Sequence, residues 1–193
     1  AYTPDGDADA IYNPVGTSPT HWQDGGWISQ VNGEEIKIAL RVDASEDGKD
    51  LDMVKMAFRN EGSNNHCAEV RVWDSDGTTV RATGNPNWVG SSTEFCGSDI
   101  DGTTTWYEFE FADGFTVEEN DYVGVEVVSG SSGSLSTPYM NCSTVTECTN
   151  YDNSRWHHQL YPNSSSGFTT WGSDYSHAIV MMGDVTVYSS YVD

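Results

Sequence analysis

Basic side chains are scarce in this sequence. Eight lysines and arginines stand against thirty aspartates and glutamates, which leaves a formal net charge of −22 at pH 7. This excess of negative charge excludes nucleic acid as a partner, because binding to it requires lysine and arginine to neutralise phosphates. Anionic membrane surfaces are disfavoured for the same reason. The composition is typical of proteins that bind divalent cations, that work in high salt, where the Debye length is about 3 Å at 1 M, or that simply keep a soluble surface.

Long apolar runs are missing too. No segment is long enough to cross a membrane, so we expect no membrane insertion. No signal peptide is visible, and the chain begins with Ala1-Tyr-Thr-Pro4 rather than with methionine. We therefore expect an exported chain whose leader has been removed, with an extracellular or cell-surface location.

The common motifs of hydrolases and zinc sites are absent as well. The sequence contains no CxxC pair, no HExxH and no G-x-S-x-G. His157 and His158 are the best catalytic candidates, but adjacent residues on a strand point to opposite faces and cannot both chelate one ion. A glycosidase needs two carboxylates at a set separation, and no pair among thirty acids stands out. We expect no enzymatic activity; a polysaccharide hydrolase or lyase with a carboxylate or histidine base is the second alternative.

What the chain does contain is strict alternation of apolar and polar residues, clearest between residues 103 and 128. The apolar members are Tyr107, Phe109, Phe111, Val123, Val125 and Val127. This period of two predicts two antiparallel strands, each with one buried face, joined by an acidic connection too long for a tight hairpin. Similar patterns predict strands within 35–42, 54–58, 68–72, 79–82 and 177–188, whereas 137–176 is predicted to be irregular.

At least eight strands and no predicted helix indicate an all-β protein. We expect a single jelly-roll-type antiparallel β-sandwich over residues 34–193, preceded by an extended N-terminal arm over residues 1–33. The arm combines prolines, glycines and aspartates with five large apolar side chains, namely Tyr2, Ile11, Tyr12, Trp22 and Trp27. We expect it to pack on the chain's own core, to be tied by a metal ion, or to pack on a neighbouring subunit.

One part of the chain resembles a known class of domains. The runs Trp106-Tyr-Glu-Phe-Glu-Phe111, Asp113-Gly-Phe-Thr-Val117 and Tyr122-Val-Gly-Val125 resemble the paired strands of secreted jelly-roll domains. Such domains occur in carbohydrate-binding modules and in surface and filament proteins of archaea and bacteria. The resemblance implies a fold, and because jelly rolls host many functions it favours no single one of them.

Cysteines and sequons support export. Four cysteines allow three pairings, and their order along the chain favours Cys67–Cys96 and Cys142–Cys148. Asn141 and Asn163 each begin an N-glycosylation sequon, which makes them candidate glycan attachment sites.

Aspartates at alternate positions are candidate calcium ligands, because Ca²⁺ takes six to eight oxygens and such residues can wrap one ion around a turn. The candidates are Asp5, Asp7, Asp9, Asp74, Asp76, Asp99 and Asp101. None of these groups completes an EF-hand loop, and Asp-Gly is also a frequent turn dipeptide. We expect calcium to stabilise the protein through at least one group.

Tryptophans are the last class of candidates. Trp73 and Trp106 fall on the strand face opposite their apolar neighbours, which predicts an exposed aromatic platform; Trp88 and Trp156 are further candidates. Such a platform can stack on sugar rings, form a protein interface, or lie beneath the N-terminal arm. We favour a non-enzymatic extracellular structural protein whose partners are copies of itself, a subunit of a filament or surface layer. The first alternative is a carbohydrate-binding module whose partner is a glycan.

Overall fold

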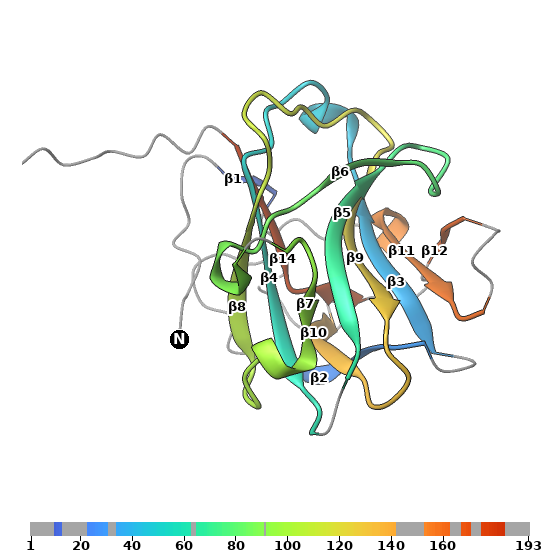
Figure 1. Ribbon diagram of the computed structural model, residues 1–193. Helices are drawn as coiled ribbons and strands as arrows, with labels where there is room; N and C mark the ends of the chain where they lie inside the picture. Colours follow the sequence, from blue (N-terminus) through green and yellow to red (C-terminus); the bar gives the residue numbers. More distant parts are fainter. Residues whose placement is uncertain are drawn as a thin grey trace, which may run out of the picture.

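Two β-sheets packed face to face make up the protein (Figure 1). The computed structural model describes residues 10–12, 23–30, 34–62, 65–90, 92–141, 153–162, 167–170 and 175–183. Those residues contain no α-helix, and their only helical turns are short 3₁₀ segments: η1 (Ala44–Glu46), η2 (Asn87–Val89), η3 (Gly97–Asp99) and η4 (Asn153–Arg155). The prediction of an all-β sandwich is confirmed.

The first sheet has four antiparallel strands. Their order is β1 (Ala10–Tyr12), β14 (Ile179–Met182), β4 (Met53–Asn60) and β8 (Thr105–Glu110). Among the described strands, the first in the chain is thus the neighbour of the last.

The second sheet is wider, and its main strands pair antiparallel. Their order is β12 (Thr169–Thr170), β11 (Trp156–Leu160), β3 (Glu35–Arg41), β9 (Tyr122–Ser129) and β5 (Cys67–Trp73), with β6 (Val80–Thr83) and β7 (Phe95–Cys96) both paired to β5. The strands β5, β9, β3, β11 and β12 form the right-hand layer of Figure 1.

A third group of strands joins the two layers at one end. It consists of β2 (Gln23–Ile28), β10 (Leu135–Asn141) and β13 (Tyr175–His177). The strand β10 pairs with β2 and β13 and also reaches β4, whereas β2 touches β3 through the single parallel pair Ile28–Glu35. The described part of the 1–33 stretch therefore belongs to the chain's own sheets, as β1 and β2.

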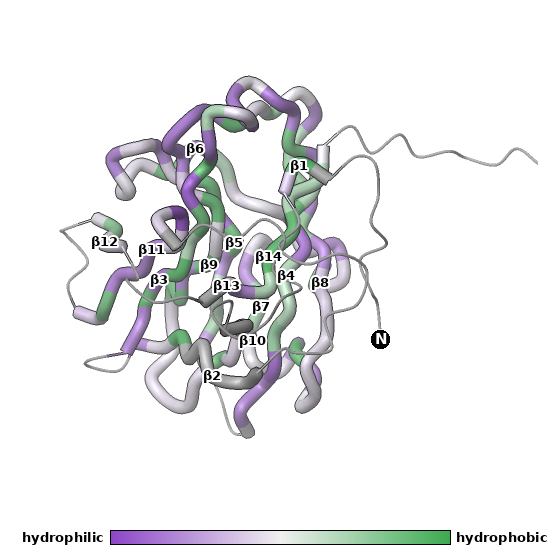
Figure 2. The backbone as a smooth tube through the Cα atoms, turned by 180° about the vertical axis from the view of Figure 1, so that it is seen from behind, coloured by the Kyte–Doolittle hydropathy of each residue, from purple (hydrophilic) through white to green (hydrophobic). Residues whose placement is uncertain are grey.

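The core lies between the two layers and follows from the alternation of residues along each strand. Three phenylalanines from different strands meet within it: Phe58 lies 5.0 Å from Phe95 and 6.2 Å from Phe109, measured between ring centroids. All three are fully buried, and burial of rings of this size is the main source of stability in such a core. Figure 2 shows hydrophobic segments along β4, β14, β5 and β9 and hydrophilic ones mostly in the connections.

The two strands predicted between residues 103 and 128 are both present, but their predicted pairing is wrong. β8 pairs with β4 in the first sheet, while β9 lies between β3 and β5 in the second. Alternation reveals that a strand has one buried face, not which strand lies beside it. The long connection between β8 and β9 does not impose a hairpin, and it crosses from one layer to the other.

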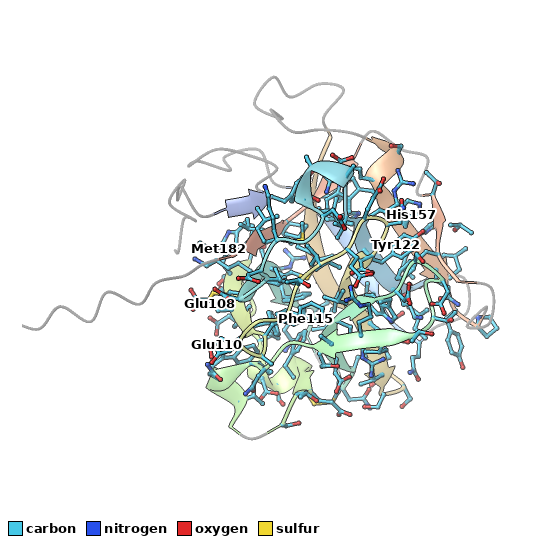
Figure 3. All side chains as sticks on the ribbon, turned by 90° about the horizontal axis from the view of Figure 1, so that it is seen from above. Glu108, Glu110, Phe115, Tyr122, His157 and Met182 are labelled. Atoms are coloured by element: carbon cyan, nitrogen blue, oxygen red, sulfur yellow. A yellow bond between two sulfur atoms is a disulfide. The ribbon has the colours of Figure 1, made fainter. Side chains whose placement is uncertain are left out.

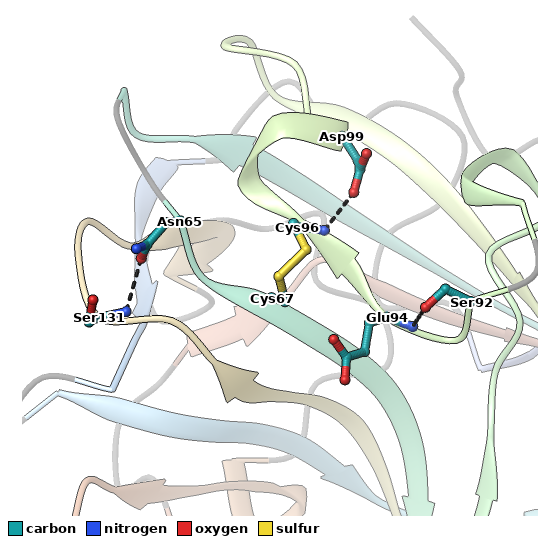
Figure 4. Close-up of a disulfide and its surroundings, with 7 residues drawn as sticks. All are labelled: Asn65, Cys67, Ser92, Glu94, Cys96, Asp99 and Ser131. Carbon is teal, nitrogen blue, oxygen red and sulfur yellow. Dashed lines mark hydrogen bonds between the residues drawn. A yellow bond between two sulfur atoms is a disulfide. The ribbon is translucent and has the colours of Figure 1, made fainter.

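The prediction for residues 137–176 is also wrong, because most of β10, all of β11 and β12, and the start of β13 fall within it. By contrast, the predicted disulfide between Cys67 and Cys96 is confirmed, since it joins β5 to β7. Figure 4 shows this bond beside Asp99, whose carboxylate accepts a hydrogen bond from the backbone N–H of Cys96 (2.7 Å). Cys142 and Cys148 lie outside the described residues.

Candidate functional site

One edge of the first sheet, at β8, is covered by another part of the same chain. Asn85 and Glu110 exchange two backbone hydrogen bonds of 2.7 and 2.9 Å along this edge. The indole N–H of Trp88 donates to the carbonyl of Glu108 (3.1 Å). Such contacts occupy the backbone groups that an edge strand would otherwise offer to another chain.

The other edge of the first sheet is closed differently, by a very short strand. β1 pairs with β14 through Ala10–Met182 and Tyr12–Met181, and the register shifts between these two pairs. β14 itself is apolar and buried on both faces, because its four residues are at most 4% exposed. Within the described ranges, this apolar strand is thus completed by three residues from near the start of the sequence.

Tyr12 anchors this short strand. Its side chain is 4% exposed and belongs to the core cluster, and the guanidinium carbon of Arg155 lies 4.8 Å from the centre of its ring. A guanidinium over an aromatic face is an attractive arrangement that strengthens as water is excluded.

Arg155 is held by groups other than Tyr12. Its Nη2 donates to both carboxylate oxygens of Glu46, at 2.9 and 2.6 Å, and its Nε donates to the carbonyl of Arg41 (2.9 Å). Glu46 also closes a capping box with Asp43 at the start of η1. Sequence reasoning missed this ion pair, because 109 residues separate its members and no local pattern joins them.

The outer face of the second sheet carries aromatic and charged residues, but it is covered. Trp73, predicted to be an exposed platform, is 0% exposed, so that prediction is wrong. The ring of Phe168 packs edge-on against Trp73 at 5.2 Å and stacks on Tyr122 at 4.6 Å. Alternation placed Trp73 correctly on the outer face, but it could not foresee that a segment almost a hundred positions later lies across that face.

Charged residues on the same face neutralise one another across neighbouring strands. Lys37 lies 3.8 Å from Glu126, and Arg71 bonds both Glu126 and Glu69. Burial is the largest influence on Lys37 and lowers the pKa of its ammonium, although Glu126 acts in the opposite direction. These charged side chains pair with one another on the sheet surface, which is typical of a structural face rather than of a ligand-binding site.

His157 and His158 point to opposite faces of β11, as expected for neighbours on a strand. His157 packs against Tyr122 at 5.0 Å between ring centroids, and Figure 3 shows the two side by side. Its Nδ1 donates to the carbonyl of Arg155 (3.0 Å), and burial lowers its pKa. His158 lies 3.6 Å from a carboxylate oxygen of Glu35. The structure does not bring the two imidazoles together into one site.

The remaining tryptophans divide by exposure. Trp156 is 1% exposed and lies in the core, so it cannot serve as a surface platform. Trp106 is partly buried and faces outward beside Ala57 of β4. Trp88 is 38% exposed and lies 4.7 Å from Tyr107, measured between ring centroids. Among the tryptophans whose side chains the structure describes, Trp88 is the exposed one.

The predicted calcium ligands that the structure describes serve local turns. Asp76 accepts hydrogen bonds from the hydroxyl of Thr79 (2.6 Å) and from the backbone N–H groups of Thr79 and Thr78 (2.7 Å each), and these bonds lower its pKa to about 2. Asp74 accepts a hydrogen bond from Ser75, Asp99 accepts one from Cys96, and Asp101 lies beside Thr105.

Within the described ranges, no group of three or more potential ligands could hold a metal ion. Asp5, Asp7, Asp9, Asn163 and the side chain of Asn141 lie outside what is described.

Comparisons with known proteins add nothing to these observations: no protein-family model, no curated protein and no solved structure matches the chain. In the part of the chain that the structure describes, no helix is both long and apolar enough to span a membrane.

One buried histidine predicts a pH dependence of stability. His177 is completely buried against Trp156, with 5.0 Å between ring centroids, and loss of hydration lowers its pKa to about 3. Its folded pKa lies below its unfolded value, so its stabilising contribution is complete above about pH 6.5 and is lost as the pH falls toward 3. We expect the free energy of unfolding to fall by about 2 kcal/mol from this group between pH 7.5 and pH 5.

Urea denaturation at both pH values would measure the change. Because the many carboxylates also titrate, the comparison is with a His177→Gln variant, whose pH dependence should be shallower by this amount. Equal slopes for the two proteins would contradict the assignment.

Proposed function

We propose that this chain is a non-enzymatic extracellular structural protein, a self-assembling subunit of a filament or surface layer. One observation carries the proposal. The fully buried, apolar strand β14 is completed at its edge by three residues from the start of the sequence, while the opposite edge at β8 is blocked. Addition of a strand to a sheet edge needs only backbone hydrogen bonds and a few side-chain pockets, so it is an available joint between copies.

The proposal that the protein is not an enzyme is supported by the histidines. His157 bonds a backbone carbonyl, His158 lies beside Glu35, and His177 is buried in the interior. A general base must reach a substrate proton within hydrogen-bond distance, and His157 and His177 are at most 6% exposed.

Calcium is part of the proposal because the subunits are strongly negative. Subunits with a net charge of −22 repel one another, and divalent cations between their carboxylates would remove that repulsion. The aspartates named above remain the proposed ligands.

The proposal predicts reversible assembly of the purified chain. At high concentration with calcium we expect oligomers or filaments in light scattering and electron microscopy, and fewer of them with a chelator at equal ionic strength. A Tyr12→Ala variant should assemble at a different rate, because Tyr12 anchors the short strand that covers this edge. A Val80→Ala variant, at an exposed position of β6, is the control and should assemble normally.

A monodisperse monomer under every condition would contradict self-assembly. The alternative is carbohydrate binding, favoured by the exposed tryptophan Trp88, whose ring packs at a tilt against that of Tyr107. It would be supported by glycan-array binding that the Trp88→Ala variant loses.

A further inference from the structure

We infer that copies of this chain join by exchange of β1: Ala10–Tyr12 of one copy leaves its own sheet and pairs with β14 of the next. This inference rests on the proposed self-assembly and names the joint.

The first step is that two side chains of β1, those of Ile11 and Tyr12, reach the body of the protein. In a regular strand, successive side chains point to opposite faces. Here the register shifts between Ala10 and Tyr12, as in a bulge, which re-aims side chains. Tyr12 lies in the core cluster, and Ile11 packs against it. The short strand is therefore held by two anchors in addition to its backbone pairing.

The second step concerns the site that receives β1, called the receptor below. No part of β1 contributes to it. Its parts are β14, the Arg155–Glu46 pair and Gly183. Arg155 is fixed by Glu46 and by the carbonyl of Arg41, so its guanidinium presents the same face to any incoming tyrosine. At Gly183 a Cβ atom would come within 3.0 Å of Ile11 Cδ1 and 2.1 Å of the Asp50 carbonyl, so glycine leaves the room that Ile11 uses. The same contacts are open to Ala10–Tyr12 of a second copy.

The third step is the length of chain that follows. Ten residues, 13–22, separate β1 from β2, and fully extended they reach up to about 35 Å, enough to cross to an adjacent copy. Exchange of an identical element between copies is a low-cost route to association, because the pairing that β1 gives up within its own chain forms again with the next chain.

The fourth step concerns direction. Each copy offers one β1 and one receptor, and the β8 edge is blocked. A joint of this kind is head to tail, and it produces open chains unless the rotation between copies closes a ring. Because β1 within one chain competes at a high effective concentration, exchange should require concentrated protein.

Cysteine trapping tests the exchange. Ala10 and Met182 are partners across the ladder, so one preparation carries Ala10→Cys and a second, of distinguishable mass, carries Met182→Cys. After the two are mixed, assembled and oxidised, we expect disulfide-linked heterodimers. A mixture of Ala10→Cys with Glu110→Cys, at the blocked edge, is the matched control and should give none.

The outcomes separate the joint from the function. Filaments without heterodimers, or equal linking in the control, would overturn exchange and leave self-assembly standing. Absence of assembly in the unmodified chain would overturn self-assembly itself. Met182 is buried, and its replacement by cysteine can disturb folding. A second measurement therefore introduces no new cysteine. Tyr12→Ala weakens β1 within its own sheet, so β1 leaves that sheet more readily and the initial rate of assembly should rise at least about tenfold. Tyr161→Ala, just beyond the end of β11, should leave the rate unchanged. An equal effect of both variants would count against exchange.

Discussion

Replacing Arg155 by alanine is expected to lower the free energy of unfolding by about 3–5 kcal/mol, because the change strands a buried carboxylate. The side chains of Arg155 and Glu46 are only 10% and 5% exposed, and Arg155 supplies two hydrogen bonds to Glu46. Loss of the guanidinium also removes the contact with the ring of Tyr12. Urea denaturation followed by tryptophan fluorescence would measure the loss.

Arg59→Ala is the matched control for this change. Arg59 pairs with Glu61 nearer the surface, at 27% and 20% side-chain exposure, and surface pairs contribute roughly 0–1 kcal/mol. A double variant, Arg155→Met with Glu46→Leu, should recover much of the stability, because an apolar pair leaves no buried charge. Equal losses in Arg155→Ala and Arg59→Ala would contradict the buried character of the first pair.

Gly124→Ala is expected to be about as damaging, at roughly 3 kcal/mol or more, for a steric reason. A Cβ atom at this position of β9 would lie 1.9 Å from the carbonyl oxygen of Ile38 and 2.6 Å from the Cα of Ala39. Both atoms belong to the backbone of β3, which cannot move without disturbing the ladder between β3 and β9. Chemical denaturation would report the loss.

Gly102→Ala is the control, because nothing lies within 4 Å of a Cβ atom there. We expect it to change stability by no more than about 0.5 kcal/mol, as for most surface substitutions. If Gly124→Ala changed the free energy of unfolding as little as Gly102→Ala, the result would contradict the close approach of β9 to β3.

The strands that sequence alone predicts best are those with strict alternation, β3, β4, β5, β8 and β9. Alternation cannot supply their partners, so it suggests pairing β8 with β9, whereas the structure pairs β8 with β4 and β9 with β3 and β5. The strand β10 escapes prediction because Leu135-Ser-Thr-Pro-Tyr-Met-Asn141 does not alternate apolar with polar residues and contains Pro138. Its place in the sheet comes from distant strands, since it pairs with β2, β4 and β13.

The candidate site is even less accessible to sequence reasoning. The aromatic residues of the 1–33 stretch suggest that this segment docks on something, and Tyr12 does contact the core. Its partner Arg155 and the supporting Glu46 carry no local signal, because the ion pair exists only after two distant parts of the chain meet. Trp73 shows the opposite failure: its strand face is predicted correctly, yet Phe168 and Lys37 cover it.

The disulfide between β5 and β7 also determines how the protein responds to mechanical load. Cys67 and Cys96 are 29 positions apart, and the segment between them contains β6 and η2. If the molecule is pulled from its two ends until its sheets separate, the covalent bridge keeps this segment out of the stretched chain. At about 3.5 Å per residue, roughly 100 Å of contour length is withheld. A reducing agent should release that length as a separate increment in a single-molecule extension trace, and Cys67→Ser should release it without one.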